Sequence, residues 1–160
     1  MRSWLGMGCG WLVDPLLGPK KTFRDPESYY RRTLRLIESR MGSSTTTARQ
    51  LDRAGGALLG NSFLGAYPSD HPAVRSMEPG QCLIVNTDET GQPGEHWLAL
   101  AHDLKRGVIA YDSFGRQVAP WALASDPDPE QRLLERNCGQ RPLAWLSCWQ
   151  KLGAAAALTI

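Results

Sequence analysis

Two residues suited to acid–base chemistry, His96 and Asp112, lie where a β-hairpin brings them together. His96 begins the apolar segment 96–102, and Asp112 ends the apolar segment 108–112. If residues 103–107 form the turn, the two side chains are diagonal neighbours on one face, about 5–8 Å apart. A shift of one residue in the pairing places them on opposite faces. In the first register, the carboxylate orients the imidazole and stabilises its protonated form.

Cys138 is the candidate nucleophile. It precedes Gly139 and the apolar segment 141–152, which we expect to be a helix with Pro142 in its first turn. The positive end of the helix dipole and a neighbouring imidazolium both favour the thiolate, which is the nucleophilic form. Gly139 leaves room for a substrate backbone. Gln131 can donate its amide, together with the backbone N–H of Cys138, to a developing oxyanion.

Each of these residues also has a purely structural interpretation. A buried cysteine is usually a small hydrophobic residue, and Cys82 and Cys148 fit that description because they lie inside apolar segments. Asp112 can simply end a strand, and His71 and His102 fit turns or the surface. Residue types and spacing alone therefore leave both a Cys–His enzyme and a set of unconnected residues open.

Composition indicates one globular domain. The chain of 160 residues is long enough for one core and too short for two full domains. A hydrophobic content of 42% with six tryptophans argues against global disorder, and a net charge of +2 does not indicate a nucleic-acid partner. No apolar run reaches the roughly 18 residues that span a bilayer. No cysteine pair has CxxC spacing and no histidine has HxxxH spacing, so we expect free thiols, no metal site and no cofactor.

The elements that must position these residues follow from caps, periodicity and turns. Asp25-Pro26 begins a helix that continues to Met41 and ends at Gly42. Residues 44–47 cap a second helix, which Gly55-Gly56 ends. Three strands joined by short turns and two helices follow, over residues 82–86, 96–102, 108–112, 130–136 and 141–152. We expect an α+β fold in which a small, mainly antiparallel sheet packs against the helix that carries the nucleophilic cysteine.

Positive charge is concentrated in the first third of the chain. Residues 19–53 carry nine basic and four acidic residues, a net charge of +5. A solvated helix face of mixed charge explains this pattern and is the interpretation that we favour. An arm formed by the basic segment 20–53, in contact with a polyanion, is the alternative.

Three segments together resemble the adenovirus-type cysteine endopeptidases, the adenain family, and more distantly the proteases specific for ubiquitin-like proteins. The order of His, acid, Gln and Cys-Gly is the same, as are the aromatic residue after the His and the Phe-Gly after the acid. The segments MGSS (41–44) and FLGAYPSDHP (63–72) resemble the beginning of the family's chains, so the resemblance covers about residues 41–150. The three main segments read CLIVNTDETGQPGEHWLAL (82–100), YDSFG (111–115) and EQRLLERNCGQRPLAWL (130–146).

The resemblance implies a role for each candidate residue. Cys138 is the nucleophile, His96 the general base, Asp112 its orienting acid and Gln131 the oxyanion-hole side chain, while Trp97 packs beside the histidine and shapes the substrate cleft. The implied activity is that of a cysteine endopeptidase, which matures virion or mobile-element precursor proteins at Gly-containing sites. Its partners are protein or peptide substrates and not a membrane, and its location is intracellular, in the virion and the host nucleus.

The chain departs from the family in ways that limit this inference. Adenain is activated by a viral peptide and by DNA, but no cysteine lies between Cys82 and Cys138 to capture such a peptide. The stretch from Gly115 to Gln131 is shorter than in adenain, and only 22 residues follow Cys138. Activation by a peptide or DNA is therefore not carried over, and the sequence does not indicate an oligomeric state.

Two domain segments and two alternative functions follow. We expect residues 1–40 to be an N-terminal extension with a basic amphipathic helix, and residues 41–160 to be a cysteine protease domain shortened at its C-terminus. One alternative keeps the chemistry but removes a ubiquitin-like modifier, as deubiquitinating or deSUMOylating isopeptidases do. The other is a non-catalytic DNA- or capsid-associated protein that uses the basic segment 20–53.

Overall fold

The computed structural model describes residues 25–117, 119–132 and 134–160, and the predictions for residues 1–24 lie outside them. Those predictions are the first part of the N-terminal extension and the beginning of the basic segment 20–53. The helices are α1 (Pro26–Met41), α2 (Ala48–Leu59), α3 (Gln140–Leu152) and α4 (Ala154–Ala157), with short 3-10 turns at Gly60–Ser62 and Pro72–Arg75. The strands are β1 (Phe63–Tyr67), β2 (Cys82–Asn86), β3 (Trp97–Asp103), β4 (Gly107–Tyr111) and β5 (Leu123–Ala124).

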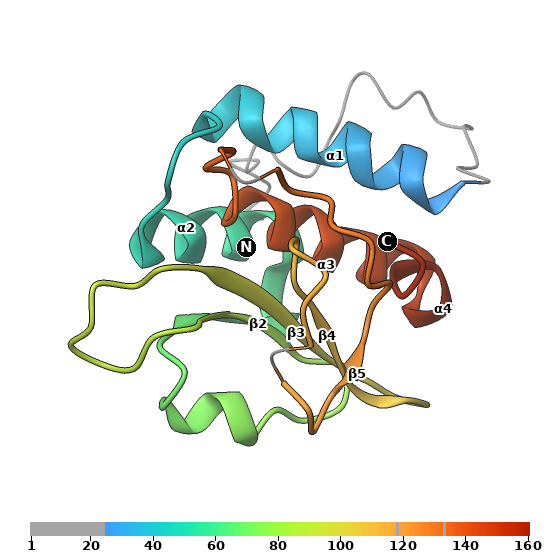
Figure 1. Ribbon diagram of the computed structural model, residues 1–160. Coiled ribbons are helices and arrows are strands. Elements are labelled where there is room, and N and C mark those ends of the chain that lie inside the picture. The colour runs from blue at the N-terminus through green and yellow to red at the C-terminus, as the bar shows by residue number, and fades with distance from the viewer. Residues whose placement is uncertain (1–24, 118, 133) are drawn as a thin grey trace, which may run out of the picture.

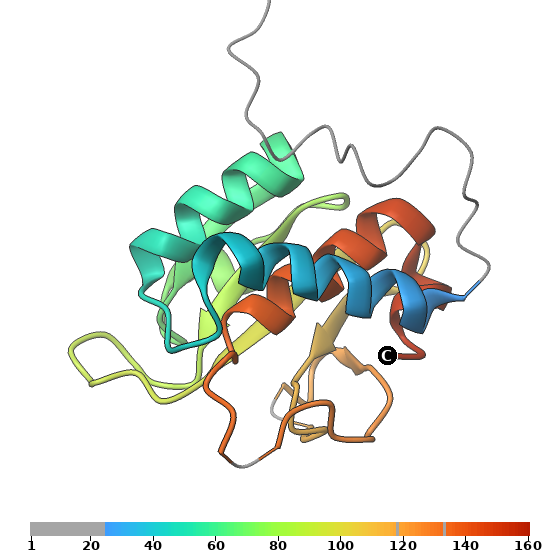
Figure 2. The ribbon, with the colours of Figure 1, turned by 90° about the horizontal axis from the view of Figure 1, so that it is seen from above.

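These elements form three layers. In Figure 1 the sheet lies below the helices, with the short turn Pro72–Arg75 beneath it; α2 and α3 cover its upper face, and α1 lies across the top of α3. Seen from above, α1 overlies α3 while α2 lies to one side (Figure 2). Helix α3 is therefore enclosed between another helix and the sheet, and each of its residues from Gln140 to Trp149 is buried.

The α+β class is confirmed, but the sheet is mixed where a mainly antiparallel one was predicted. Its strands are in the order β1-β2-β3-β4-β5. Strands β2, β3 and β4 form the predicted antiparallel meander, whereas β1 pairs parallel with β2 and β5 pairs parallel with β4. Both parallel edges lie in segments where no strand was predicted, and longer connections, not hairpins, join them to their neighbours.

The register of the β3–β4 hairpin is the predicted one. His102 pairs with Val108 and Ala99 pairs with Tyr111. Alternate residues of the central strands face two separate clusters, one beneath the helices and one on the other side, where Val74 and Met77 cover the sheet. Burial of both faces explains why these strands are continuously apolar and do not alternate with polar residues.

Helix α1 has the predicted bounds because both of its ends have strong local signals. The Asp25 side chain accepts hydrogen bonds from the backbone N–H groups of Glu27 and Ser28, and Pro26 occupies the first turn. Gly42, with φ of +81°, ends the helix in a conformation that favours glycine. The buried face of α1 includes Tyr30, Leu34 and Ile37, which belong to the core around α3.

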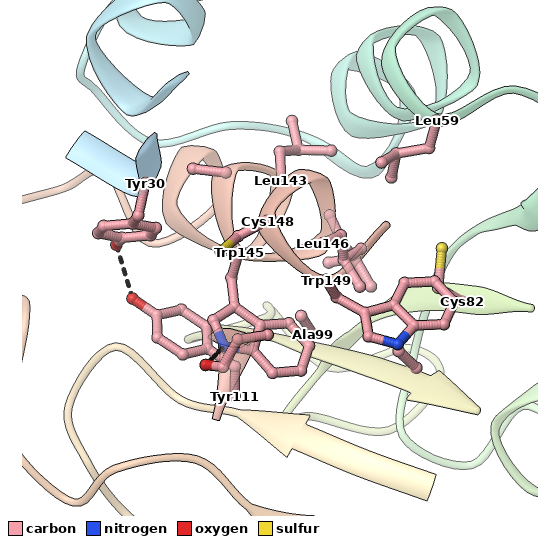
Figure 3. Packing of buried hydrophobic residues seen from close by; sticks show 14 of the residues in the cluster. Tyr30, Leu59, Cys82, Ala99, Tyr111, Leu143, Trp145, Leu146, Cys148 and Trp149 are labelled. Atoms are coloured by element: carbon pink, nitrogen blue, oxygen red, sulfur yellow. Dashed lines mark hydrogen bonds between the residues drawn. The ribbon is translucent and has the colours of Figure 1, made fainter. Parts of the chain in front are cut away.

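The centre of this core is Trp145 of α3. Its ring stacks on Tyr111 of β4 with 5.5 Å between centroids, and its indole N–H donates to the carbonyl of Ala157 at 2.8 Å. Figure 3 shows the two rings together beneath α3, with the hydroxyl groups of Tyr30 and Tyr111 joined by a hydrogen bond. One aromatic cluster thus links α1, α3, α4 and the sheet.

Two helix predictions were wrong. The segment 130–136 has no helix in its described residues, because its polar groups bond to other parts of the fold: the Gln131 N–H, for example, donates to the carbonyl of Ser113. Helix α2 does not end at Gly55-Gly56 but continues to Leu59. Gly55 is buried against the ring of Phe63, and a Cβ atom there would overlap the ring, whereas Gly56 faces open space.

Replacing each of the two glycines of α2 by alanine is expected to change the free energy of unfolding in opposite directions. Gly56→Ala is expected to raise the free energy of unfolding by about 0.5–1 kcal/mol, because alanine loses less backbone entropy in a helix. Gly55→Ala is expected to lower it by about 1–3 kcal/mol, because Phe63 must move. Urea unfolding of both variants measures the difference, and equal effects would contradict the assigned packing.

Candidate active site

His96 and Asp112 form a buried pair at one end of the β3–β4 hairpin. The His96 Nε2 and Asp112 Oδ1 atoms are 2.7 Å apart, and the two side chains are 6% and 1% exposed. His96 immediately precedes β3 and Asp112 immediately follows β4, so the paired strands bring them to the same end. The structure therefore brings together the two residues that the hairpin register predicted as neighbours.

The Asp112 carboxylate has two further contacts that keep it ionised. The Phe114 N–H donates to Oδ1 at 2.9 Å, and the Arg116 Nε donates to Oδ2 at 2.8 Å. Burial by itself raises the pKa of Asp112, but the hydrogen bonds from His96, Phe114 and Arg116 outweigh it, so the pKa lies below the ordinary value. A carboxylate that stays charged can stabilise an imidazolium beside it.

The imidazole of His96 has the opposite shift. Burial by itself lowers its pKa, but the hydrogen bonds and negative charges of Asp112 and Cys138 outweigh burial and hold the pKa above the ordinary value. The ring of Phe114 packs on the imidazole, with 4.7 Å between centroids. Since Nε2 is hydrogen-bonded to Asp112, Nδ1 is the ring nitrogen that is left for the thiol of Cys138.

Cys138 lies at the start of α3, one residue before the N-cap Gly139. It is a free thiol and only partly buried, whereas the free thiols of Cys82 and Cys148 are buried. Burial raises the pKa of both Cys82 and Cys148 to about 12, which keeps them protonated. Among the described cysteines, only Cys138 is partly exposed, and it is also one of the groups that raise the pKa of His96.

Two hydrogen bonds between Gln131 and Ser113 hold Gln131 beside the residue that follows Asp112. The Gln131 N–H donates to the Ser113 carbonyl at 2.8 Å, and the Ser113 hydroxyl donates to Gln131 Oε1 at 2.6 Å. The Gln131 Nε2 atom donates to the Glu135 carbonyl at 2.6 Å. An amide nitrogen has two hydrogens, so the second remains for another acceptor.

Gly139 has a packing reason to be glycine that the sequence did not reveal. A Cβ atom at this position would overlap Oγ1 of Thr46, in the segment that precedes α2. The carbonyl of Thr46 also accepts a hydrogen bond from the Trp97 indole at 3.2 Å, so Trp97 lies beside the segment in contact with Gly139. The Thr46 hydroxyl is itself buried without a hydrogen-bond partner.

A cleft of about 500 Å³ includes Cys138 and Trp97 in its walls. Asn86 and the segments 45–48, 66–68 and 88–95 supply the remaining lining residues, and His96 is not one of them. Among the described residues, no group of three or more His, Cys, Asp or Glu side chains could hold a metal ion, and no helix is long and apolar enough to cross a membrane. The walls of the cleft carry the thiol of Cys138, the indole of Trp97, and carboxylates and hydroxyls from the segments 45–48 and 88–95.

Sequence reasoning missed Arg116, Ser113 and Glu135. Arg116 lies four residues after Asp112 and Ser113 immediately follows it, so both were close to a candidate acid. Their contacts depend on how the chain turns after β4, which no local pattern specified. Glu135 was assigned to a helix, although its carbonyl accepts the Gln131 amide.

The Gly139–Thr46 contact can be tested with a double variant. Gly139→Ala is expected to destabilise the fold by about 1–3 kcal/mol through overlap with Thr46. Thr46→Ala removes a buried hydroxyl that has no partner and should cost little, and combining the two should recover part of the loss. Urea unfolding of the four proteins measures the coupling; strictly additive effects would contradict the contact.

The stabilisation from Asp112 should depend on pH. Because its folded pKa lies below the unfolded value, its contribution is present above the unfolded pKa of about 3.9 and is lost as the pH falls through the folded pKa. Asp112→Asn is expected to lower the free energy of unfolding by about 2 kcal/mol at pH 6. Urea unfolding at pH 6, 4 and 3 should show the difference shrinking, and a constant difference would contradict the ionised pair.

Comparison with known proteins confirms the predicted resemblance as a distant similarity. No protein-family model matches the chain. The chain is 35% identical over 74 residues to the protein named "Protease" of Avian adenovirus 8 (strain ATCC A-2A), and 35% identical over 75 residues to the protein of the same name of Snake adenovirus serotype 1. The matches cover 45% and 46% of this chain but only 36% of each relative, so the chain matches about a third of the length of these curated proteins. Part of the chain is thus similar to adenovirus proteases.

Proposed function

We propose that the protein is a cysteine endopeptidase that cleaves viral or mobile-element precursor proteins at Gly-containing sites. The observation that carries this proposal is the buried His96–Asp112 pair, together with the partly exposed thiol of Cys138, which helps to raise the pKa of His96. The similarity to two adenovirus proteins named "Protease" supports the same class of reaction. The choice of precursor substrates rests on the resemblance alone.

The reaction begins with the thiolate of Cys138, which attacks the carbonyl carbon of the scissile peptide bond. The carbonyl oxygen becomes negatively charged and accepts hydrogen bonds from the Cys138 N–H and from the side-chain amide of Gln131. His96, protonated and stabilised by Asp112, donates its proton to the leaving amine as the C–N bond breaks. The products of this half-reaction are a free amine and a thioester on Cys138.

Water completes the cycle. Neutral His96 removes a proton from a water molecule, whose oxygen attacks the thioester carbonyl. The C–S bond breaks, the carboxylic acid product leaves, and the thiolate and imidazolium are restored. Asp112 does not exchange a proton in either half; it orients the ring and stabilises its charged form.

The test compares three cysteine variants on defined substrates. Cys138→Ala is expected to lower the rate of peptide cleavage by at least about 10³-fold and to abolish labelling by a thiol-reactive peptide probe, because it removes the nucleophile. Cys82→Ala and Cys148→Ala are matched controls, since both thiols are buried and protonated, and they should keep the labelling. Cleavage is followed by mass spectrometry.

Two substrate sets then separate the kinds of protease. Gly-containing precursor peptides should be cleaved, and fusions that carry a ubiquitin-like modifier should not. Turnover of the fusions alone would replace the endopeptidase proposal by the isopeptidase alternative. Probe labelling that persists in Cys138→Ala would contradict both, because the reactive thiol would then lie elsewhere.

A further inference from the structure

The segment that carries Gln131 and leads to Cys138 has no regular structure to hold its shape. Within residues 131–137, the described part forms only bends and turns. One end is fastened by the hydrogen bonds between Gln131 and Ser113. The other end enters α3 directly after Cys138 and Gly139. The hydrogen bond from Gln131 Nε2 to the Glu135 carbonyl holds the first part of the path between these two points, and a further contact must hold the rest.

That contact is the guanidinium of Arg141, in the first turn of α3. Its Nε donates to Asn137 Oδ1 at 3.0 Å and its Nη2 donates to Glu135 Oε2 at 2.9 Å, so a single planar group holds two residues of the segment. Its Nη1 donates to the Tyr30 hydroxyl at 3.3 Å. Arg141 is 7% exposed, and its charge is enclosed by these partners.

Helix α1 supplies the far side of this network. Glu38 Oε1 accepts a hydrogen bond from Asn137 Nδ2 at 2.7 Å, which fastens the residue directly before Cys138. The Tyr30 hydroxyl shares a hydrogen bond of 2.7 Å with Tyr111 of β4, next to Asp112 (Figure 3). The helix thus contacts both the segment before Cys138 and the strand β4, which directly precedes Asp112.

A buried network of charged groups contributes little to stability, so its geometry is the better explanation for its presence. Burial of a guanidinium carries a desolvation penalty, and apolar residues of similar volume often give equal or greater stability. A planar group with donors in fixed directions, in contrast, specifies the distance between its acceptors. The described residues offer no strand or helix that would do the same for residues 131–137.

We propose that Arg141 and Glu38 are positioning residues, which hold the segment 131–137 so that Cys138 reaches His96 and Gln131 reaches the oxyanion. Helix α1, most of which lies in the predicted N-terminal extension, then supports the site through Glu38 and Tyr30, which face the network. This inference rests on the proposed function for its activity readout. The reactivity of the Cys138 thiol provides a second readout that does not need a substrate.

The sharpest test compares Glu38→Ala with Glu38→Gln in the full chain. Both remove the charge, but only glutamine keeps an oxygen that accepts from Asn137. Glu38→Ala is expected to lower kcat on the order of 10²-fold with KM within about twofold, as misplacement of a reacting group by about 1 Å does. Glu38→Gln should restore most of kcat. A merely structural role would not separate kcat from KM or follow the acceptor oxygen.

Two further variants complete the set. Arg141→Lys keeps the positive charge but loses the fork, and is expected to lower kcat like Glu38→Ala. Arg31→Ala is the matched control on α1, because Arg31 pairs with Glu27 on the exposed face of the helix. It should leave kcat within about twofold. Thermal unfolding of each variant identifies a temperature at which all of them are folded, and kcat is measured there. If Arg141→Lys fails to fold, the comparison of Glu38→Ala with Glu38→Gln alone tests the positioning role.

Alkylation of Cys138 by iodoacetamide at pH 7, located by mass spectrometry, distinguishes the two levels of failure. Glu38→Ala should slow this alkylation at least about fivefold relative to the parent and Glu38→Gln, because the thiol moves away from His96. If the parent cleaves no peptide, the proposed function fails while this readout still tests the positioning. Unchanged alkylation and unchanged kcat in both Glu38→Ala and Arg141→Lys would overturn the inference.

Discussion

The structure depends on a carboxylate buried at the end of the sheet. A charge removed from water is costly unless hydrogen bonds and opposite charges surround it. Asp112 obtains them from His96 across the hairpin, from the Phe114 N–H in the following turn and from Arg116 at the edge. The β3–β4 register, the turn after β4 and the conformation of the histidine must therefore all be correct together, and an error in any one leaves a buried charge without partners.

Local signals predicted much of the fold. The ends of α1, the meander of β2 to β4 and its register follow from caps and apolar runs within a few residues of each element. The errors occur where distant contacts override such signals. Helix α2 continues through Gly55, where the ring of Phe63 packs and leaves no room for a side chain, and β5 is a strand of two residues because it pairs with the edge of β4.

The candidate site divides in the same way. The types and order of His96, Asp112, Gln131 and Cys138 were visible in the sequence, and the hairpin predicted the first pair. Their support was not visible, because Glu38 and Asn137 are separated by 99 positions and Tyr30 and Arg141 by 111. No periodicity or motif in a single sequence indicates that residues so far apart will be in contact.

Helix α3, which follows Cys138, needs a second layer of protein over its outer side. Every residue of α3 from Gln140 to Trp149 is buried, so its outer side requires a cover as apolar as the sheet beneath it. Helix α1 is that cover, and Tyr30, Leu34 and Ile37 supply the apolar contacts. Because α3 begins two residues after Cys138, whatever orients α3 also orients the thiol. The packing of α1 on α3 and the hydrogen bonds of Arg141 and Asn137 therefore link the first third of the chain to the residues around Cys138, which is the basis of the positioning role proposed for Arg141 and Glu38.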